Sequence, residues 1–222
     1  MAMEENGEQI EAAVAFVDLV RFTALTDVHG DHVAADAAVA IEQSARRRVG
    51  PRVKFIKAAG DGVLLQATAP ADGLRAAGEV VEDVHDLGLD ARAGVHYGPV
   101  VARNGDIYGS TVNLASRLAA LAPPGTVMVT RPVALAVHET PFAVSPRGPT
   151  EVKGLHDLVE TFLVDPCSHD GTWVTDPVCG MRLDETTARP GPEPSVDGRG
   201  FCSPRCEGLY AEDPSRYRAT ES

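Results

Sequence analysis

Two aspartates, Asp18 and Asp61, stand where the chain leaves apolar segments, and together they could bind a divalent cation. Asp18 follows the apolar run AVAFV at 13–17, and Asp61 lies between two glycines that connect further apolar runs. Each alone has an ordinary structural explanation, because aspartate is common as a helix cap and in turns. Paired at adjacent tips of a sheet, two carboxylates suit Mg²⁺, which prefers one or two carboxylates together with substrate phosphates.

A second set of polar residues has a spacing and a composition suited to phosphate. Asn113 and Arg117 are four residues apart, so on a helix they share one face and can reach a single phosphate. The chain has 20 basic residues, of which only Lys54, Lys57 and Lys153 are lysines. In an arginine-rich chain, a retained lysine indicates a need for a compact point donor. The ordinary alternatives are an exposed polar stripe on a helix and solvated surface cations.

The elements that position these residues follow from hydrophobic periodicity and glycine placement. Strands are expected at 13–17, 53–56, 63–67, 91–102 and 126–130, with a final strand pair within 150–164. Helices are expected at 32–49, 74–87 and 111–121, with Gly50 and Gly88 closing the first two. Strands outnumber helices, and Gly60-Asp61-Gly62 favours a tight hairpin. The expected fold class is therefore α+β, a ferredoxin-like mixed sheet with helices packed on it.

The cysteines divide the chain into two parts. All four lie in the last quarter, after a segment rich in Pro, Gly, Ser and Asp. We therefore expect a large cysteine-free domain at 1–166, a linker at 167–175 and a small cysteine-bearing domain at 176–218.

Four blocks of the large domain resemble the class III nucleotidyl cyclases and occur in that family's order. They are FVDLVRFTAL (16–25), VKFIKAAGDGVLL (53–65), RAGVHYGPVVARNGDIYGSTVNLASRL (92–118) and VKGLHDLVETFLV (152–164). The resemblance implies a homodimer with active sites at its interface. It also implies conversion of a nucleoside triphosphate to a 3′,5′-cyclic nucleotide and pyrophosphate, with two Mg²⁺ or Mn²⁺ ions per site.

The resemblance assigns a role to each matched residue. It implies that Asp18 and Asp61 hold the metal ions, that Asn113 and Arg117 stabilise the transition state, and that Lys153 binds the triphosphate. Arg117 would neutralise charge on the transferring phosphoryl group.

Lys57 and Asp106 match the pair that selects the base. Adenine presents an N6 donor and an N1 acceptor, which an adjacent carboxylate and ammonium satisfy. Guanine presents the reverse polarity and would leave these groups unpaired, so the sequence favours ATP over GTP.

Two features depart from the family pattern. Arg21 stands where the family usually has a glycine, and it could either add a phosphate contact or crowd the turn. The segment 103–105 is short and resembles the short-armed bacterial subgroup, which could loosen the dimer.

The small domain resembles the YHS domain, a module linked to metal handling, through DPVCGM (176–181), FCSPRC (201–206) and DPSRY (213–217). Cys202 and Cys206 are four residues apart at an expected helix start, and with Cys179 they could bind Zn²⁺ or Cu⁺. The fourth ligand is left open among Cys167, His169 and water. A disulfide or inert buried thiols are the alternatives, although a reducing cytosol disfavours the disulfide. The other histidines show no ligand spacing and are interpreted as structural: His29, His32, His85, His96, His138 and His156.

Charge and composition argue against nucleic acid and membranes as partners. A formal net charge of −12 disfavours nucleic-acid binding, and no apolar run is long enough to cross a bilayer. The first ten residues lack the apolar core of a signal peptide, so a cytoplasmic protein is expected. The hypothesis is a homodimeric adenylate cyclase with a metal- or redox-responsive C-terminal module. The alternatives are a cyclase-fold nucleotide-binding protein that senses metal or redox state without turnover, and a guanylate cyclase.

Overall fold

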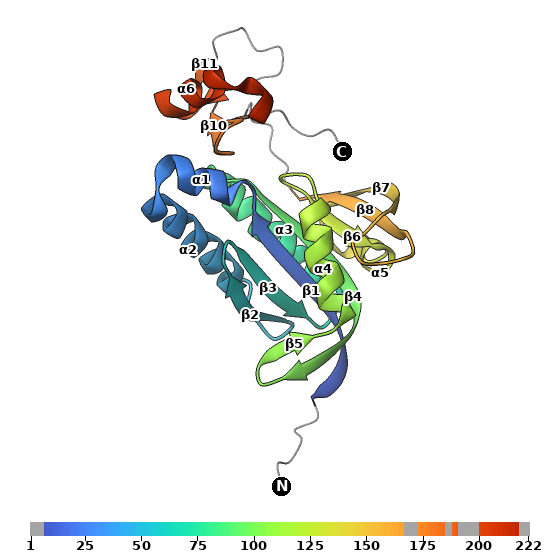
Figure 1. Cartoon of the computed structure of the whole chain (residues 1–222). Coiled ribbons are helices and arrows are strands. Elements are labelled where there is room, and N and C mark those ends of the chain that lie inside the picture. The colour runs from blue at the N-terminus through green and yellow to red at the C-terminus, as the bar shows by residue number, and fades with distance from the viewer. Residues whose placement is uncertain (1–6, 167–172, 185–187, 191–199, 218–222) are drawn as a thin grey trace.

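The computed structural model describes residues 7–166, 173–184, 188–190 and 200–217, and its centre is one mixed sheet (Figure 1). The strand order is β2-β3-β1-β4-β6-β8-β7, with β5 paired to the end of β4. Every neighbouring pair is antiparallel except β4 and β6. The strands are β1 (Glu8–Leu19), β2 (Val53–Ala59), β3 (Gly62–Ala67), β4 (Ala91–Arg103), β5 (Asp106–Tyr108), β6 (Val127–Thr130), β7 (Ala143–Thr150) and β8 (Val159–Asp165). The expected mixed α+β sheet is confirmed.

Helices pack on both faces of this sheet. Ala15 and Val17 of β1 pack in one core with the longer helices α2 and α3, whereas Ala12 and Val14 pack in another with Ala115 of α4. Successive strand side chains point to opposite faces, so α4 lies on the face opposite α2 and α3, as Figure 1 shows. The helices are α1 (Phe22–His29), α2 (Asp31–Arg47), α3 (Pro70–Asp86), α4 (Ser110–Leu121) and α5 (Arg131–Ala134), with a 3₁₀ turn at Val137–Glu139. No helix within the described ranges is both long and apolar enough to span a membrane.

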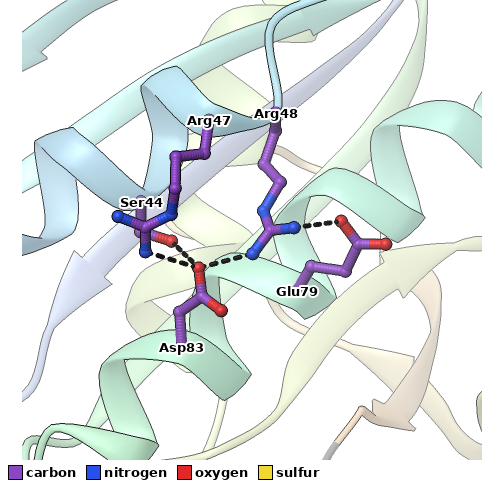
Figure 2. Close-up of polar contacts among 5 residues, drawn as sticks. All are labelled: Ser44, Arg47, Arg48, Glu79 and Asp83. Atoms are coloured by element: carbon purple, nitrogen blue, oxygen red, sulfur yellow. Dashed lines mark hydrogen bonds and ion pairs between the residues drawn. The ribbon is translucent and has the colours of Figure 1, made fainter.

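One polar network joins α2 to α3 (Figure 2). Ser44 Oγ donates a hydrogen bond of 2.6 Å to Asp83 Oδ2, and both Arg47 and Arg48 form ion pairs with the same carboxylate. Arg48 also pairs with Glu79 at 3.0 Å. Burial opposes ionisation of Asp83, but the hydrogen bonds from Ser44, Arg47 and Arg48 outweigh it and lower the pKa of this carboxyl group. The network fixes the two helices that cover one face of the sheet.

The position of α4 depends on a glycine in β4. A β-carbon at Gly94 would lie 2.2 Å from the carbonyl oxygen of Ala115 and 2.3 Å from the amide nitrogen of Ala119. No side chain fits there, so Gly94 allows the helix backbone to approach the strand directly. This contact fixes the distance between α4 and the sheet, and therefore the position of the polar face of α4.

The described C-terminal residues form a small second unit beyond α1 in Figure 1. Two short two-stranded sheets precede a helix. The elements are β9 (Trp173–Thr175), β10 (Arg182–Asp184), β11 (Arg189–Pro190), β12 (Gly200–Phe201), α6 (Pro204–Glu212) and a 3₁₀ turn at Pro214–Tyr217. Val178, Cys179, Phe201 and Cys206 form its core, and Val28 of α1 belongs to the same core. The small unit is therefore packed directly on the large domain.

Three sequence predictions about elements were wrong. The final strand pair is not contained in 150–164, because β7 ends at Thr150 and 151–158 forms the connection to β8. The edge strand β7 contains Pro146 and Pro149, which hide its strand pattern and are tolerated only at an edge. Helix α1 is absent from the expected helices, because the sequence analysis assigns no element to the segment between the strand at 13–17 and the helix at 32–49. Helix α2 ends before Gly50, at a right-handed Arg48.

Candidate active site and cysteine cluster

The two aspartates meet at one end of the sheet. Asp18 lies opposite Gly62 of β3 and Arg92 of β4. The next residue, Leu19, donates its backbone N–H to the carbonyl oxygen of Asp61 at 3.1 Å, which ties the β2–β3 turn to the end of β1. The structure thus brings together the two carboxylates that the sequence singled out.

Gly62 leaves the space that this arrangement requires. A β-carbon at Gly62 would lie 3.0 Å from the carbonyl oxygen of Val17 and 3.2 Å from Asp18 Oδ1. Contacts this short are rarely seen for real side chains, so a larger residue would push Asp18 away from the turn. Close packing against Val17 and Asp18 therefore explains why a glycine follows Asp61.

The carboxylate pair is electrostatically strained without a cation. Burial raises the pKa of Asp18, and the neighbouring Asp61 raises it further. Arg92 opposes this, with its Nη2 3.6 Å from Asp18 Oδ2, but its Nη1 also donates to the carbonyl oxygen of Ala120 in α4. A divalent cation would supply the missing positive charge, and carboxylate oxygens are ligands suited to Mg²⁺ or Mn²⁺. The donor set fits such an ion.

Arg21 makes a contact that the sequence did not suggest. Its backbone adopts the left-handed conformation, φ 57° and ψ 31°, at the N-cap of α1, where no side chain caps the helix. Glycine adopts this conformation without strain, which explains the residue that the family pattern favours here. The Arg21 guanidinium donates to the carbonyl oxygen of Pro177, and its stem packs on Gly180. Arg21 therefore contacts the C-terminal unit.

Lys57 and Asp106 form an ion pair between the edge strand β2 and β5. Lys57 Nζ lies 2.6 Å from Asp106 Oδ2, and the N–H of Ile107 donates to Oδ1 at 2.8 Å. The hydrogen bond from Lys57 lowers the pKa of Asp106. A register shift between Phe55 and Lys57 interrupts the strand alternation at this lysine. The two residues matched to base selection are thus adjacent.

Asn113 and Arg117 lie on α4, and Lys153 lies in the connection before β8. Asn113 is exposed on α4, and the Arg117 guanidinium lies against Gly154, where an added β-carbon would be 3.1 Å from a guanidinium nitrogen. Gly154 has φ 78° and follows the exposed Lys153 in the connection before β8. Among the described residues, no hydrogen bond or ion pair joins this group to Asp18 or Asp61.

Three thiols and one imidazole converge beside α1. Cys202 Sγ lies 3.6 Å from Cys179 Sγ, 3.5 Å from Cys206 Sγ and 3.4 Å from His29 Nε2. His29 was interpreted as structural, and no spacing signal identifies it because it precedes Cys179 by 150 residues. Cys202 lies before α6, not within it, and Ser203 is the N-cap. The earlier candidates for a fourth ligand, at 167 and 169, lie outside the described residues.

The thiols are free and influence one another's ionisation. The hydrogen bond with Cys179 lowers the pKa of Cys202 to about 6. Burial raises the pKa of Cys206 to about 12, and the hydrogen bond with Cys202 together with burial raises that of Cys179. Closely spaced thiols do not ionise together without a compensating cation.

Comparison with known proteins identifies the family of the large domain. Residues 5–166 match the family model described as the adenylate and guanylate cyclase catalytic domain. The chain belongs to this family. It is 38% identical over 160 residues to a pH-sensitive adenylate cyclase of Mycobacterium tuberculosis, covering 69% of this chain and 40% of that protein. It is also 38% identical over 120 residues to an adenylate cyclase of Streptomyces coelicolor, covering 53% of this chain and 32% of the relative. The chain thus spans less than half the length of these curated relatives.

Solved structures of cyclases share the fold of this domain. An adenylate/guanylate cyclase/hydrolase from Silicibacter pomeroyi aligns with TM-score 0.62 and 22% identity, covering 73% of this chain and 100% of that one. The adenylyl cyclase CyaB from P. aeruginosa aligns with TM-score 0.59 and 18% identity, covering 73% and 97%. At these identities the likeness concerns the cyclase fold alone.

Proposed function

We propose that this member of the cyclase family is an adenylate cyclase that converts ATP to 3′,5′-cyclic AMP and pyrophosphate. The ribose 3′-oxygen forms a bond to the α-phosphorus, the bond from that phosphorus to the oxygen bridging the β-phosphate breaks, and the 3′-hydroxyl proton passes to solvent. The observation that carries the proposal is the convergence of Asp18 and Asp61 at one turn, where burial and mutual repulsion raise the pKa of Asp18.

Asp18 and Asp61 would hold two Mg²⁺ or Mn²⁺ ions. Such ions supply acidification of the 3′-hydroxyl and charge neutralisation on the leaving pyrophosphate. The chain itself positions the carboxylates through the Leu19–Asp61 backbone bond and the space at Gly62. Arg92, shared between Asp18 and the end of α4, limits their movement.

Lys57 and Asp106 would recognise adenine. Their 2.6 Å ion pair presents an ammonium donor and a carboxylate acceptor side by side, the polarity complementary to N1 and the N6 amine. Guanine would face an acceptor with O6 and a donor with N1–H, leaving polar groups unpaired. This pair supports ATP over GTP, and it is the reason that guanylate cyclase is the less favoured alternative.

A second copy of the chain would complete each active site. Asn113, Arg117 and Lys153 carry the side chains suited to the phosphates, but among the described residues no hydrogen bond or ion pair joins them directly to the carboxylates. In a two-fold dimer, each site takes the carboxylates of one copy and the α4 residues of its partner. Arg117 would then stabilise charge on the transferring phosphoryl group.

The alternative without turnover rests on Arg21, which stands where the family pattern has a glycine. The Arg21 side chain contacts Pro177 and Gly180 of the C-terminal segment, and this contact gives less support to that alternative. Two relatives named adenylate cyclase give additional support to the catalytic proposal.

The test is product formation by the purified full-length chain with Mn²⁺ and then Mg²⁺. Cyclic AMP is separated by chromatography, GTP is offered in competition, and Asp61→Ala is assayed in parallel. We expect cyclic AMP from wild type and none from the variant. Nucleotide binding by a folded dimer without cyclic product would refute the proposal and favour the binding alternative, and cyclic GMP as the main product would favour guanylate cyclase.

For the C-terminal segment we propose a metal-binding domain at 176–218 of the YHS type, connected by the linker 167–175. Its motifs resemble that family, and its cysteines Cys179, Cys202 and Cys206 lie within bonding distance of a common soft ion such as Zn²⁺ or Cu⁺. A metal- or redox-dependent effect on cyclisation follows as a hypothesis from the contact between this segment and α1.

A further inference from the structure

The cysteine cluster has a fourth potential ligand that comes from the cyclase domain. His29 is the last residue of α1, whereas the three cysteines lie in the C-terminal segment. One ligand atom from each of the four residues lies within 4.8 Å of all the others. The four side chains come from three segments that are distant in the sequence, those around His29, Cys179 and Cys202–Cys206.

The three distances from Cys202 Sγ are close to those of a tetrahedral zinc site. With Zn–S bonds of about 2.3 Å and Zn–N bonds of about 2.0–2.1 Å, tetrahedral ligands lie about 3.8 Å apart for two sulfurs and about 3.6 Å apart for sulfur and nitrogen. The observed distances from Cys202 Sγ are 3.5 and 3.6 Å to the other thiols and 3.4 Å to His29 Nε2. A disulfide needs about 2.05 Å, so the cluster is spaced for an ion and not for a covalent bond.

A buried carboxylate holds the cysteine segments in place. Asp176 is fully buried, and its Oδ1 accepts the N–H groups of Val178 and Cys179 at 2.8 and 3.3 Å. Its Oδ2 accepts the N–H of Cys202 at 2.8 Å. One side chain thus connects the two chain segments that carry the thiols, as the outer-shell partners of metal sites do.

Contacts along α1 position the imidazole. Val28, beside His29, is buried in the core that contains Cys179 and Cys206. Arg205 of α6 donates to the carbonyl oxygen of Asp27 at 3.2 Å. With the Arg21–Pro177 contact at the other end of the helix, α1 is attached to the C-terminal segment along its length.

We propose that one Zn²⁺ is bound jointly by the two parts of the chain, with an imidazole from the cyclase domain and three thiolates from the C-terminal segment. The four ligands are His29, Cys179, Cys202 and Cys206. Four protein ligands leave no open position, which is typical of structural zinc. The inference deepens the proposed metal-binding role of the C-terminal segment and does not depend on cyclase activity. Because α1 begins four residues after Asp18, the ion connects the small unit to the segment that carries a metal-site aspartate.

The test measures metal content and ligand chemistry in the full-length protein, purified under reducing conditions. Elemental analysis is expected to give one zinc per chain. Replacing His29 by Ala should weaken zinc binding, measured by competition with a chromophoric chelator, by more than about 100-fold, because loss of even an outer-shell partner costs about 10–100-fold. His32→Ala is the matched control, since His32 is exposed on the next helix, three residues away.

Substitution with Co²⁺ separates a ligand from a merely structural residue. Wild type should show thiolate-to-cobalt charge transfer and the visible bands of a tetrahedral ion. In His29→Ala the visible bands should change, and added imidazole should restore them. Unchanged cobalt spectra and zinc affinity in His29→Ala would overturn the assignment of His29. Reduced wild type that binds neither zinc nor cobalt, or that binds Cu⁺ without need of His29, would overturn the site. Cyclase activity enters none of these readouts.

Discussion

Among single residues, Asp18 combines its proposed metal-binding role with a stability penalty. Replacing it by Asn removes the repulsion from Asp61 and the burial of a charge, so in Mg²⁺-free buffer Asp18→Asn should melt at a higher temperature than wild type. The folded state raises the pKa of Asp18, so its ionised form weakens folding. The difference should therefore shrink as pH falls through that raised pKa.

Added Mg²⁺ should reverse this order. An ion present at ten times its dissociation constant stabilises the state that binds it by about 1.4 kcal/mol, and only wild type has the complete pair. Thermal unfolding with and without Mg²⁺ measures both effects. Asp36→Asn, an exposed aspartate on α2, is the control and should respond to Mg²⁺ as wild type does. Equal stabilisation of Asp18→Asn by Mg²⁺ would show that the ion binds elsewhere.

The proposed selection of the base depends on two single residues, Lys57 and Asp106. Lys57→Ala removes the donor of the Lys57–Asp106 pair, so kcat/KM for ATP should fall about 10–100-fold, the effect of about 1–3 kcal/mol for an unpaired polar group. Turnover of GTP should not fall in parallel. Lys54→Ala, on the same strand, should change neither. Parallel losses with both nucleotides would mean that Lys57 acts on the phosphates or on folding, and not on the base.

Among the elements, α2 and α3 are joined by the polar network around Asp83 (Figure 2). Asp83→Ala should lower the free energy of unfolding by about 1–3 kcal/mol, because Ser44 and Arg48 lose their shared acceptor. Glu82→Ala on the same helix should cost less. Chemical denaturation measures both, and equal costs would contradict a special role for Asp83.

The same network predicts a pH dependence. The pKa of Asp83 is lowered in the folded state, so its contribution is complete above the ordinary value of 3.8 and disappears as pH falls through the lower folded value. The difference in stability between wild type and Asp83→Ala should thus be constant near neutrality and should vanish only in strong acid.

Periodicity predicts the elements that follow ordinary patterns and misses those that do not. Helices 74–87 and 111–121 could be placed from apolar spacing, because each buries one face on the sheet. Helix α1 has only eight residues and begins at a left-handed arginine without a side-chain cap, so no start signal marks it. Edge strand β7 contains two prolines, which are unusual in strands, so its sequence does not predict a strand.

The candidate site shows the same limit. Motif blocks identify Asp18, Asp61 and the other matched positions, because each has a fixed place relative to a strand or turn. Contacts between distant segments leave no trace in spacing. Arg92 of β4 pairs with Asp18 of the neighbouring strand β1, and His29 lies beside thiols more than 140 residues away in the sequence. Only the folded structure shows that these two residues belong to the candidate sites.

For the whole molecule, the proposed catalysis requires that two copies of the chain share each active site. The carboxylates and the Asn113–Arg117 pair each belong to one chain, and among the described residues no hydrogen bond or ion pair joins them directly. If a two-fold dimer unites them, a subunit lacking Asp61 and a subunit lacking Arg117 together contain one intact site and one doubly defective site. Neither variant alone retains an intact site.

The most direct measurement is therefore cyclic AMP formation by a mixture of Asp61→Ala and Arg117→Ala, each purified, shown to be folded, and inactive alone. Random exchange makes half of the dimers mixed, with one of two sites intact, so the mixture should recover about one quarter of wild-type activity. A mixture that stays inactive under conditions where subunits exchange would show that the two residues act within the same chain, and would contradict the shared site.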